Sequence, residues 1–192
     1  MNNLIDLTLE LKKDNPIFGK SNAKMLSFMN AGHIGTHLDI RQQEEVPLEY
    51  MESRGCKVDV SHVSQREIGL DDLGDAVISK GDFVVFYTGF MNRTPYGKPG
   101  YFDNHPQLSH DLIDYLIEKK VSFIGIDAAG IRRGREHREA DERCAEKGVF
   151  VIENLDNLAK VDGARSFSIT CLWISREGAT GLPCRVVAKQ LN

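Results

Sequence analysis

The stretch HIGTHLDI, residues 33–40, places two histidines and an aspartate within seven positions of the chain. In an extended chain His33, His37 and Asp39 would point to the same face, because side chains two or four residues apart share a face of a strand. A fully extended path would still separate His33 from His37 by ~13 Å, which is too far for a shared ion. A bend at Gly35, a residue type that tolerates unusual backbone angles, would bring the three side chains together.

Two imidazoles and one carboxylate on a short segment form a ligand set that suits a divalent ion such as Zn²⁺ or Mn²⁺. Three protein ligands also leave coordination positions for water and a substrate. The alternative is that both histidines are core residues whose ring nitrogens bond to the backbone. We favour the metal site, because a structural histidine needs no second histidine and no aspartate at this spacing.

The composition is that of an ordinary globular protein and fits one domain that spans residues 1–192. Hydrophobic residues make up 41% and charged residues 27% of the chain, and the net charge is -4. These values give no indication of disorder or of a nucleic-acid partner. The most basic stretch, RRGREHRE at 132–139, mixes Arg with Glu and is typical of a solvated helix face.

Cysteine spacing and the N-terminal sequence indicate a cytoplasmic protein. The four cysteines lie far apart without a C-x-x-C pair, which argues against a thiolate metal site or a redox motif. Residues 1–16, MNNLIDLTLELKKDNP, lack the basic and apolar regions of a signal peptide. No apolar run approaches the ~18 residues of a membrane span, so we expect no membrane partner.

Strand patterns dominate the first third of the chain and alternate with helical patterns afterwards, which predicts a mixed α/β domain with more strand than helix. Strands are predicted at 4–11, 57–63, 82–90, 121–127, 149–153, 164–175 and 184–191. A short helix is predicted within the stretch 68–82, opened by Asp71 and Asp72 and closed before Gly81. Further helices are predicted at 110–120, with Ser109 as the cap, and within 132–148, where Gly148 is the stop. The Pro- and Gly-rich stretch 91–107 is predicted to be a surface loop, and loops of that length are often functional.

Several motifs together resemble one enzyme family. HIGTHLD (33–39) resembles the H-x-G-T-H-x-D core of the cyclase-like metal-dependent hydrolases, the family that includes bacterial kynurenine formamidase and isatin hydrolase. Further resemblances follow in the family's order over nearly the whole chain: LIDLTLELKKDNPIFG (4–19), KGDFVVFYTGF (80–90), VSFIGIDAAGI (121–131), VFVIENLDNL (149–158) and LPCRVVA (182–188). The metal motif and E-N-L in this order are the specific signals.

The resemblance implies an α/β fold of the swivelling β/β/α type, with a β-rich mixed sheet and flanking helices in a single domain. It also implies a homo-oligomer, dimer or tetramer, that hydrolyses an amide, lactam or related carbonyl bond of a small molecule. His33, His37 and Asp39 are carried over as metal ligands. Glu153 in E-N-L matches the family's acidic site residue, as ligand and catalytic group; a cap or salt bridge for the following turn is the alternative.

Two positions depart from the family pattern. The family continues D-x-P-x-H, whereas here Gln43 occupies the histidine position and cannot exchange a proton near neutral pH. Twelve residues before Glu153, where the family often has a further histidine, stands Asp141. His137 lies one helical turn earlier on the same face and is a possible substitute ligand. These departures weigh against formamidase activity specifically and leave open whether the centre holds one ion or two.

The mechanism we expect is single-metal hydrolysis, in which the ion activates water and polarises the scissile carbonyl. Glu153, or alternatively Asp141, would take the proton and deliver it to the leaving atom. Aromatic residues that could line an apolar substrate pocket also commonly serve as core. The candidates to contact the substrate are Phe18, Gln43, Tyr87 and Phe90.

A rival hypothesis is a non-catalytic member of the same family that binds a metal or a small ligand. Gln43 and Asp141 favour it, because both replace residues of the family's usual proton shuttle. Turnover assays on formyl-amides, lactams and lactones separate the two hypotheses.

Overall fold

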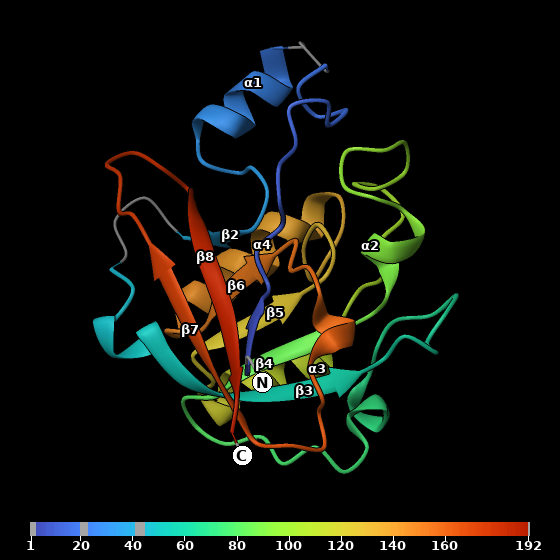
Figure 1. Ribbon diagram of the computed structural model, residues 1–192, viewed down its shortest axis with the longest axis vertical. Helices are drawn as coiled ribbons and strands as arrows, with labels where there is room; N and C mark the ends of the chain where they lie inside the picture. Colours follow the sequence, from blue (N-terminus) through green and yellow to red (C-terminus); the bar gives the residue numbers. More distant parts are fainter. Residues whose placement is uncertain (1–2, 20–22, 41–44, 192) are drawn as a thin grey trace.

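In the part of the chain that the structure describes, eight strands form one sheet that closes on itself, with helices on its outside (Figure 1). The structure, a computed structural model, describes residues 3–19, 23–40 and 45–191. In these residues the strands are β1 (Leu4–Asp6), β2 (His37–Asp39), β3 (Glu52–Asp59), β4 (Phe83–Tyr87), β5 (Phe123–Ile126), β6 (Phe150–Glu153), β7 (Phe167–Trp173) and β8 (Gly181–Gln190). The α-helices there are α1 (Ala23–Asn30), α2 (Phe90–Arg93), α3 (His110–Lys119) and α4 (Arg135–Ala145).

The last strand closes the sheet into a barrel. The strand order is β1-β8-β2-β6-β5-β4-β3-β7, and a further pairing of β7 with β8 makes a ring of all strands except β1. β8 is long enough to pair with β7 over Cys184–Gln190, with β2 over Gly181–Pro183 and with β1 over Val187–Lys189. β3 pairs with β4, β4 with β5 and β5 with β6, all in parallel. The other pairs are antiparallel. The predicted fold class, a β-rich mixed sheet with flanking helices, is confirmed.

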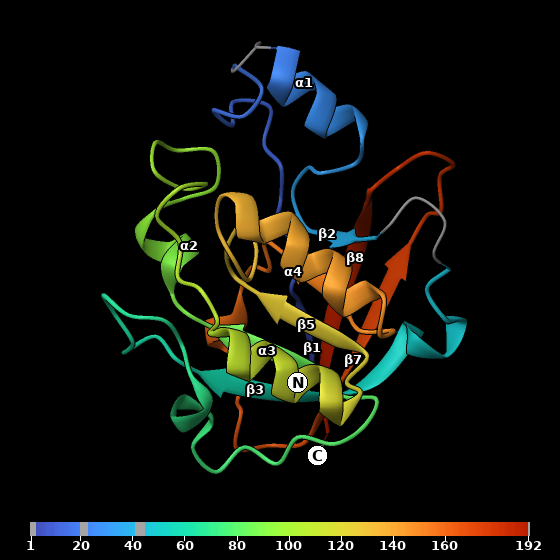
Figure 2. The same ribbon diagram turned by 180° about the vertical axis from the view of Figure 1, so that it is seen from behind.

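Side chains of the barrel strands alternate between two apolar cores. One core fills the barrel and includes Leu38, Phe83 and Ile152. The other lies between the barrel and helices α3 and α4, which cross the sheet in Figure 2, and includes Val84 and Phe86. Because both faces of β4 and β5 are covered, these strands are apolar along their whole length.

Most of the predicted helices and strands are present, but some of their ends differ. α3 begins after Ser109, whose Oγ accepts a hydrogen bond from Leu112 N, as the sequence predicted. The strand predicted at 57–63 instead runs from Glu52 to Asp59, because its first residues extend beyond β4 to pair with β7. The helix predicted at 68–82 is only a 3-10 turn, Leu70–Leu73, which ends at Gly74 with φ 52°.

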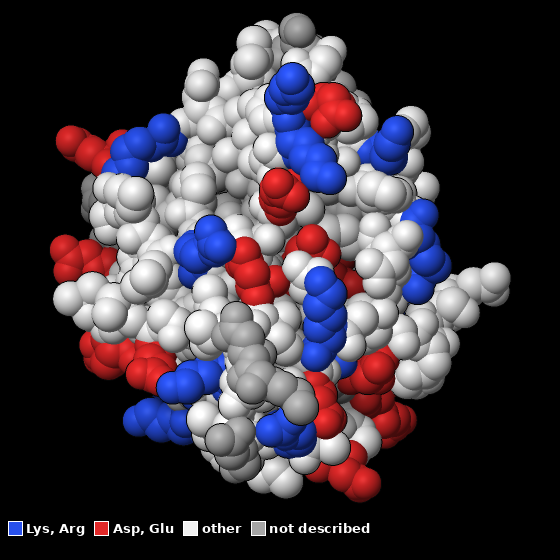
Figure 3. Space-filling view, viewed as in Figure 1, with Lys and Arg blue, Asp and Glu red and all other residues white. Residues whose placement is uncertain are grey.

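The surface combines charges of both signs with one projecting apolar helix. On the face drawn in Figure 3, acidic and basic side chains are interspersed. Within the basic stretch 132–139, Arg132 is buried and donates to two carboxylates, so the solvated helix face that the sequence predicted begins only with α4.

α1, which the sequence did not predict, extends from one end of the molecule (Figures 1 and 2). In the described ranges, no helix has both the length and the apolar character that a bilayer crossing requires.

Candidate metal centre

Strands β2 and β6 bring three ligand-type side chains to one outer face of the barrel. The two strands pair antiparallel, with His37 opposite Glu153. Leu38 and Ile152 belong to the core inside the barrel, so the alternation of each strand turns His37, Asp39 and Glu153 outward beneath α4. All three are buried, with 5% or less of their surface exposed.

His33 reaches the same point from the turn before β2. Gly35 has a φ of 60°, in the left-handed region that favours glycine, so the chain bends where the sequence predicted. His33 Nε2 lies 2.8 Å from Thr180 Oγ1, which leaves Nδ1 facing the other ligands. That Nδ1 is 3.1 Å from His37 Nε2 and 3.0 Å from Asp39 Oδ1, and His37 Nε2 is 3.5 Å from the same oxygen.

Helix α4 adds His137 and Asp141 to the cluster. They lie one turn apart on the helix, and His137 Nε2 is 3.2 Å from Asp141 Oδ2 and 3.1 Å from Glu153 Oε1. The other oxygen of Glu153, Oε2, is 3.6 Å from His37 Nε2, so this carboxylate connects the two halves of the cluster. A Cβ on Gly130 would lie 2.6 Å from the His137 ring and 2.8 Å from Glu153 Oε1, so glycine there leaves room for both.

The donor atoms fit a divalent cation. Ligand bonds of ~2.0–2.1 Å in a tetrahedral zinc site put neighbouring donor atoms roughly 3.3 Å apart, and the three distances among His33, His37 and Asp39 are 3.0–3.5 Å. Both oxygens of Asp39, Oδ1 of Asp141 and Oε1 of Glu153 are buried and make no hydrogen bond within the described residues. Asp39, His137, Asp141 and Glu153 also lie close enough together to share an ion.

The carboxylates of the cluster hold protons on the imidazoles of His37 and His137. Burial lowers the pKa of His37, but the carboxylates of Asp39 and Glu153 outweigh it and raise that pKa to about 9. Burial likewise opposes the positive charge of His137, whose pKa Glu153 and Asp141 raise to about 11. The pKa of Asp141 is raised well above its usual value by burial and by the charge of Asp39. A divalent ion bound here would therefore displace protons.

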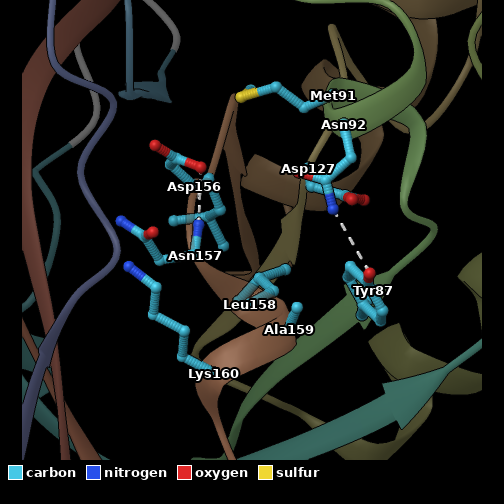
Figure 4. A pocket seen from close by; sticks show the side chains of 10 residues that line it. Tyr87, Met91, Asn92, Asp127, Asp156, Asn157, Leu158, Ala159 and Lys160 are labelled. Carbon is cyan, nitrogen blue, oxygen red and sulfur yellow. Dashed lines mark hydrogen bonds between the residues drawn. The ribbon is translucent and has the colours of Figure 1, made fainter.

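The residues predicted to contact the substrate do not gather at this centre. Phe18 is 44% exposed on the segment before α1. Tyr87, whose hydroxyl accepts a hydrogen bond from Asn92, lines a separate cavity of about 120 Å³ (Figure 4). Phe90 is a core residue whose ring packs 5.5 Å from that of Tyr101, as expected for a buried aromatic residue. Gln43 lies outside the described residues.

Sequence reasoning missed two side chains, Thr180 and Asn154, that make hydrogen bonds to or beside the candidate ligands. Thr180 bonds to His33 from the far end of the chain, and no local pattern links the two positions. Asn154 bonds to the carbonyl of Gly35 next to His37, and its place in the E-N-L motif was the available signal.

The comparisons with known proteins agree with this fold. A family model described as "Putative cyclase" matches residues 5–132. Among solved structures, a potential metal-dependent hydrolase with cyclase activity has a TM-score of 0.77 at 22% identity, with 98% of each chain covered. A predicted metal-dependent hydrolase from Bacillus stearothermophilus has a TM-score of 0.71 at 21% identity, covering 96% of this chain and 97% of that one.

Isatin hydrolase A from Labrenzia aggregata, bound to benzyl benzoate, has a TM-score of 0.74 at 17% identity, covering 96% of this chain and 92% of the other. A comparison with curated proteins finds no significant match. The structural likenesses show the fold, and the family model includes His33, His37 and Asp39 but ends before α4 and β6. Since that model spans well over half of the sequence, the chain belongs to this cyclase family.

Proposed function

We propose that the chain is a metal-dependent hydrolase that cleaves an amide, lactam or related carbonyl bond of a small molecule. The observation that carries the proposal is the convergence of His33 Nδ1, His37 Nε2 and Asp39 Oδ1 within 3.0–3.5 Å of one another. The buried oxygens of Asp39 and Glu153 that make no hydrogen bond within the described residues support it, since buried acceptors without a hydrogen bond are costly and an ion would satisfy them. The metal-dependent hydrolases among the structural neighbours point the same way.

His33, His37 and Asp39 would hold the ion, with Glu153 as a further ligand. When bound, a Zn²⁺ or Mn²⁺ ion supplies a water of lowered pKa and polarises the scissile carbonyl. Both ions suit imidazole and carboxylate donors, and the three carboxylates of the cluster keep Mn²⁺ a candidate beside Zn²⁺. Whether His137 and Asp141 complete a second cation site is decided by the amount of metal that the protein binds.

Glu153 is the group we assign to proton transfer. Water adds its oxygen to the carbonyl carbon, Glu153 Oε1 takes one water proton, and that proton goes to the leaving nitrogen when the carbon–nitrogen bond breaks. His137 Nε2, 3.1 Å from Oε1, keeps this carboxylate oriented and is itself paired with Asp141. Asp141 is the alternative proton acceptor. The side chain of His137 is 32% exposed and connects the pair to solvent.

Elemental analysis and a turnover screen test the proposal together. Protein purified without chelators or a His-tag should contain at least one equivalent of metal, and His37→Ala should lose it. A panel of formyl-amides, lactams and lactones should then show turnover that Glu153→Gln abolishes. The matched control is Glu142→Gln, a carboxylate at the surface of α4 paired with Arg138.

The screen also decides between the hydrolase and its rival. Bound metal with no turnover on the whole panel would favour a non-catalytic binding protein of the same family. Normal turnover by Glu153→Gln would reject its assigned role, and absence of metal in the wild type, even after incubation with Zn²⁺ or Mn²⁺, would reject the hydrolase.

We also propose a homo-oligomer in which a second copy of the chain covers α1. This helix projects from the molecule, and its Leu26 and Phe28 are 49% and 48% exposed. The ring of Phe28 packs edge-on against that of His33, 6.0 Å away, so the interface would adjoin the metal centre. Light scattering should give a multiple of the 21.5 kDa chain mass. Leu26→Glu should reduce that mass, whereas Leu172→Glu, equally exposed on β7, should not.

The cytoplasm is the compartment we propose. All four cysteines are free and buried, which suits a reducing compartment. Fractionation of the source cells tests this, and recovery of the protein outside the cytoplasmic fraction would contradict it.

A further inference from the structure

The long connection between α2 and α3 contains two tyrosines whose hydroxyls make hydrogen bonds beside the candidate metal centre. Tyr96 and Tyr101 belong to the stretch 91–107 that the sequence predicted to be a surface loop, yet both are buried. Tyr101 is fully buried, with its ring packed against those of Phe90 and Phe102. A buried hydroxyl is costly unless it is hydrogen-bonded, so its partner is informative.

Three consecutive hydrogen bonds connect Tyr101 to His37. Tyr101 Oη donates to Asn154 Oδ1 over 2.7 Å, and Asn154 Nδ2 donates to the carbonyl of Gly35 over 2.9 Å. His37 Nδ1 donates to the same carbonyl over 2.9 Å. Two residues, Asn154 and Gly35, therefore lie between the Tyr101 hydroxyl and the predicted metal ligand His37, and the polar groups that connect them are buried.

The direction of each bond is fixed by chemistry. A carbonyl oxygen only accepts, so Gly35 O requires the proton on His37 Nδ1 and leaves Nε2 free to face the carboxylates. The same carbonyl requires the amide nitrogen of Asn154, so the amide oxygen must face Tyr101. Asn154 has a φ of 56°, a conformation that asparagine adopts more readily than most residues.

The second tyrosine secures the other side of the same turn. Gly35 N donates to Tyr96 Oη over 3.1 Å, and Thr36 Oγ1 donates to the carbonyl of Asn154 over 2.8 Å. The peptide groups on both sides of Gly35 are thus held by the loop and by the residue after Glu153. Such partners behind a metal ligand orient it and commonly change metal affinity by 10–100-fold.

We propose that Tyr101 is a positioning residue of the metal centre: through Asn154 and the Gly35 carbonyl it fixes the ring orientation and tautomer of His37 and so sets metal affinity. The inference rests on the proposed function, because it requires that His37 binds a metal. It assigns to the 91–107 loop the role of holding the centre from behind.

The test compares Tyr101→Phe with a matched tyrosine elsewhere. Phenylalanine keeps the ring packing and removes only the hydroxyl. Tyr50 is the control, since its hydroxyl donates to a carbonyl oxygen too, the backbone one of Gly148 over 3.1 Å, and its ring also packs against aromatic neighbours. We would measure the dissociation constant for Zn²⁺ by chelator competition and the visible spectrum of the Co²⁺ form, with the melting temperature of the metal-free proteins as the measure of folding.

We expect Tyr101→Phe to weaken Zn²⁺ binding by about 10-fold or more and to alter the Co²⁺ spectrum, and Tyr50→Phe to stay within about twofold of wild type. Asn154→Gly, which tolerates the same φ, should give a similar loss, and the double variant should lose little more than either alone. If Tyr101→Phe does not fold, Asn154→Gly reports on the same connection.

Two results would overturn the inference in different ways. Wild-type affinity and an unchanged Co²⁺ spectrum in Tyr101→Phe and Asn154→Gly would reject the positioning role while the metal centre stands. Failure of the wild-type protein to bind Zn²⁺, Mn²⁺ or Co²⁺ would reject the proposed function and this inference together.

Discussion

Metal removal should lower the melting temperature of the wild-type chain by about 7 °C. Four buried oxygens of Asp39, Asp141 and Glu153 make no hydrogen bond within the described residues, and an unsatisfied buried group costs about 1–3 kcal/mol. An ion present at a hundred times its dissociation constant stabilises the folded state by ~2.7 kcal/mol. An unfolding entropy of about 2.1 cal/mol/K per residue gives roughly 0.4 kcal/mol/K for the 192-residue chain, hence a shift of about 7 °C.

Differential scanning calorimetry of chelator-treated protein, with and without Zn²⁺ or Mn²⁺ at a hundred times the measured dissociation constant, checks this value. His37→Ala should lose the shift, because its ring nitrogen is one of the converging donor atoms. His110→Ala should keep it, because His110 is 53% exposed on α3. An unshifted wild type, or a full shift in His37→Ala, would refute the reasoning.

Three further predictions, two substitutions and one thiol-labelling measurement, test the surroundings of the candidate centre and the core. Thr180→Val removes the partner of His33 Nε2 and should weaken Zn²⁺ binding about 10-fold in a chelator competition, with little change in the melting temperature of the metal-free protein. Gly125→Ala places a Cβ 2.6 Å from Leu155 inside the barrel and should destabilise the fold by about 1–3 kcal/mol in urea unfolding; an unchanged midpoint would mean that the barrel interior adjusts. The thiols should not react with Ellman's reagent at pH 8 in the native protein, because all are buried and burial, with Asp141, raises the pKa of Cys144 to about 12; all four should react in denaturant, and rapid native labelling would contradict the burial.

The elements with both faces buried were the most predictable from the sequence. β4, β5 and β6 are short apolar runs, and the amphipathic pattern with a serine cap predicted α3. α1 was missed because its exposed Leu26 and Phe28 do not follow the pattern of a helix with one buried face. The barrel closure could not be read from local pattern, since it depends on β8 pairing with strands from both ends of the chain.

The candidate site likewise combines residues that the local sequence predicted with residues that only the fold brings together. His33, His37 and Asp39 were predicted because they share one segment and a glycine that permits the bend. The family resemblance pointed to Asp141, and helical spacing from it pointed to His137 as a substitute ligand; only the structure shows both beside Glu153. Tyr101 and Thr180 act across the fold, so no spacing along the chain could have pointed to them.

Because its strand β2 is only three residues long and pairs with late strands, the candidate metal centre should form late in protein synthesis. Among the described residues, β2 has hydrogen-bonded neighbour strands only in β6 and β8, which the ribosome makes more than a hundred residues later. A nascent chain that ends before Phe150 already contains His33, His37 and Asp39, yet it lacks both strands with which β2 pairs. Such long-range pairings form slowly, because distant segments must meet first. Metal capture would therefore report that the final strand has been made and has closed the barrel.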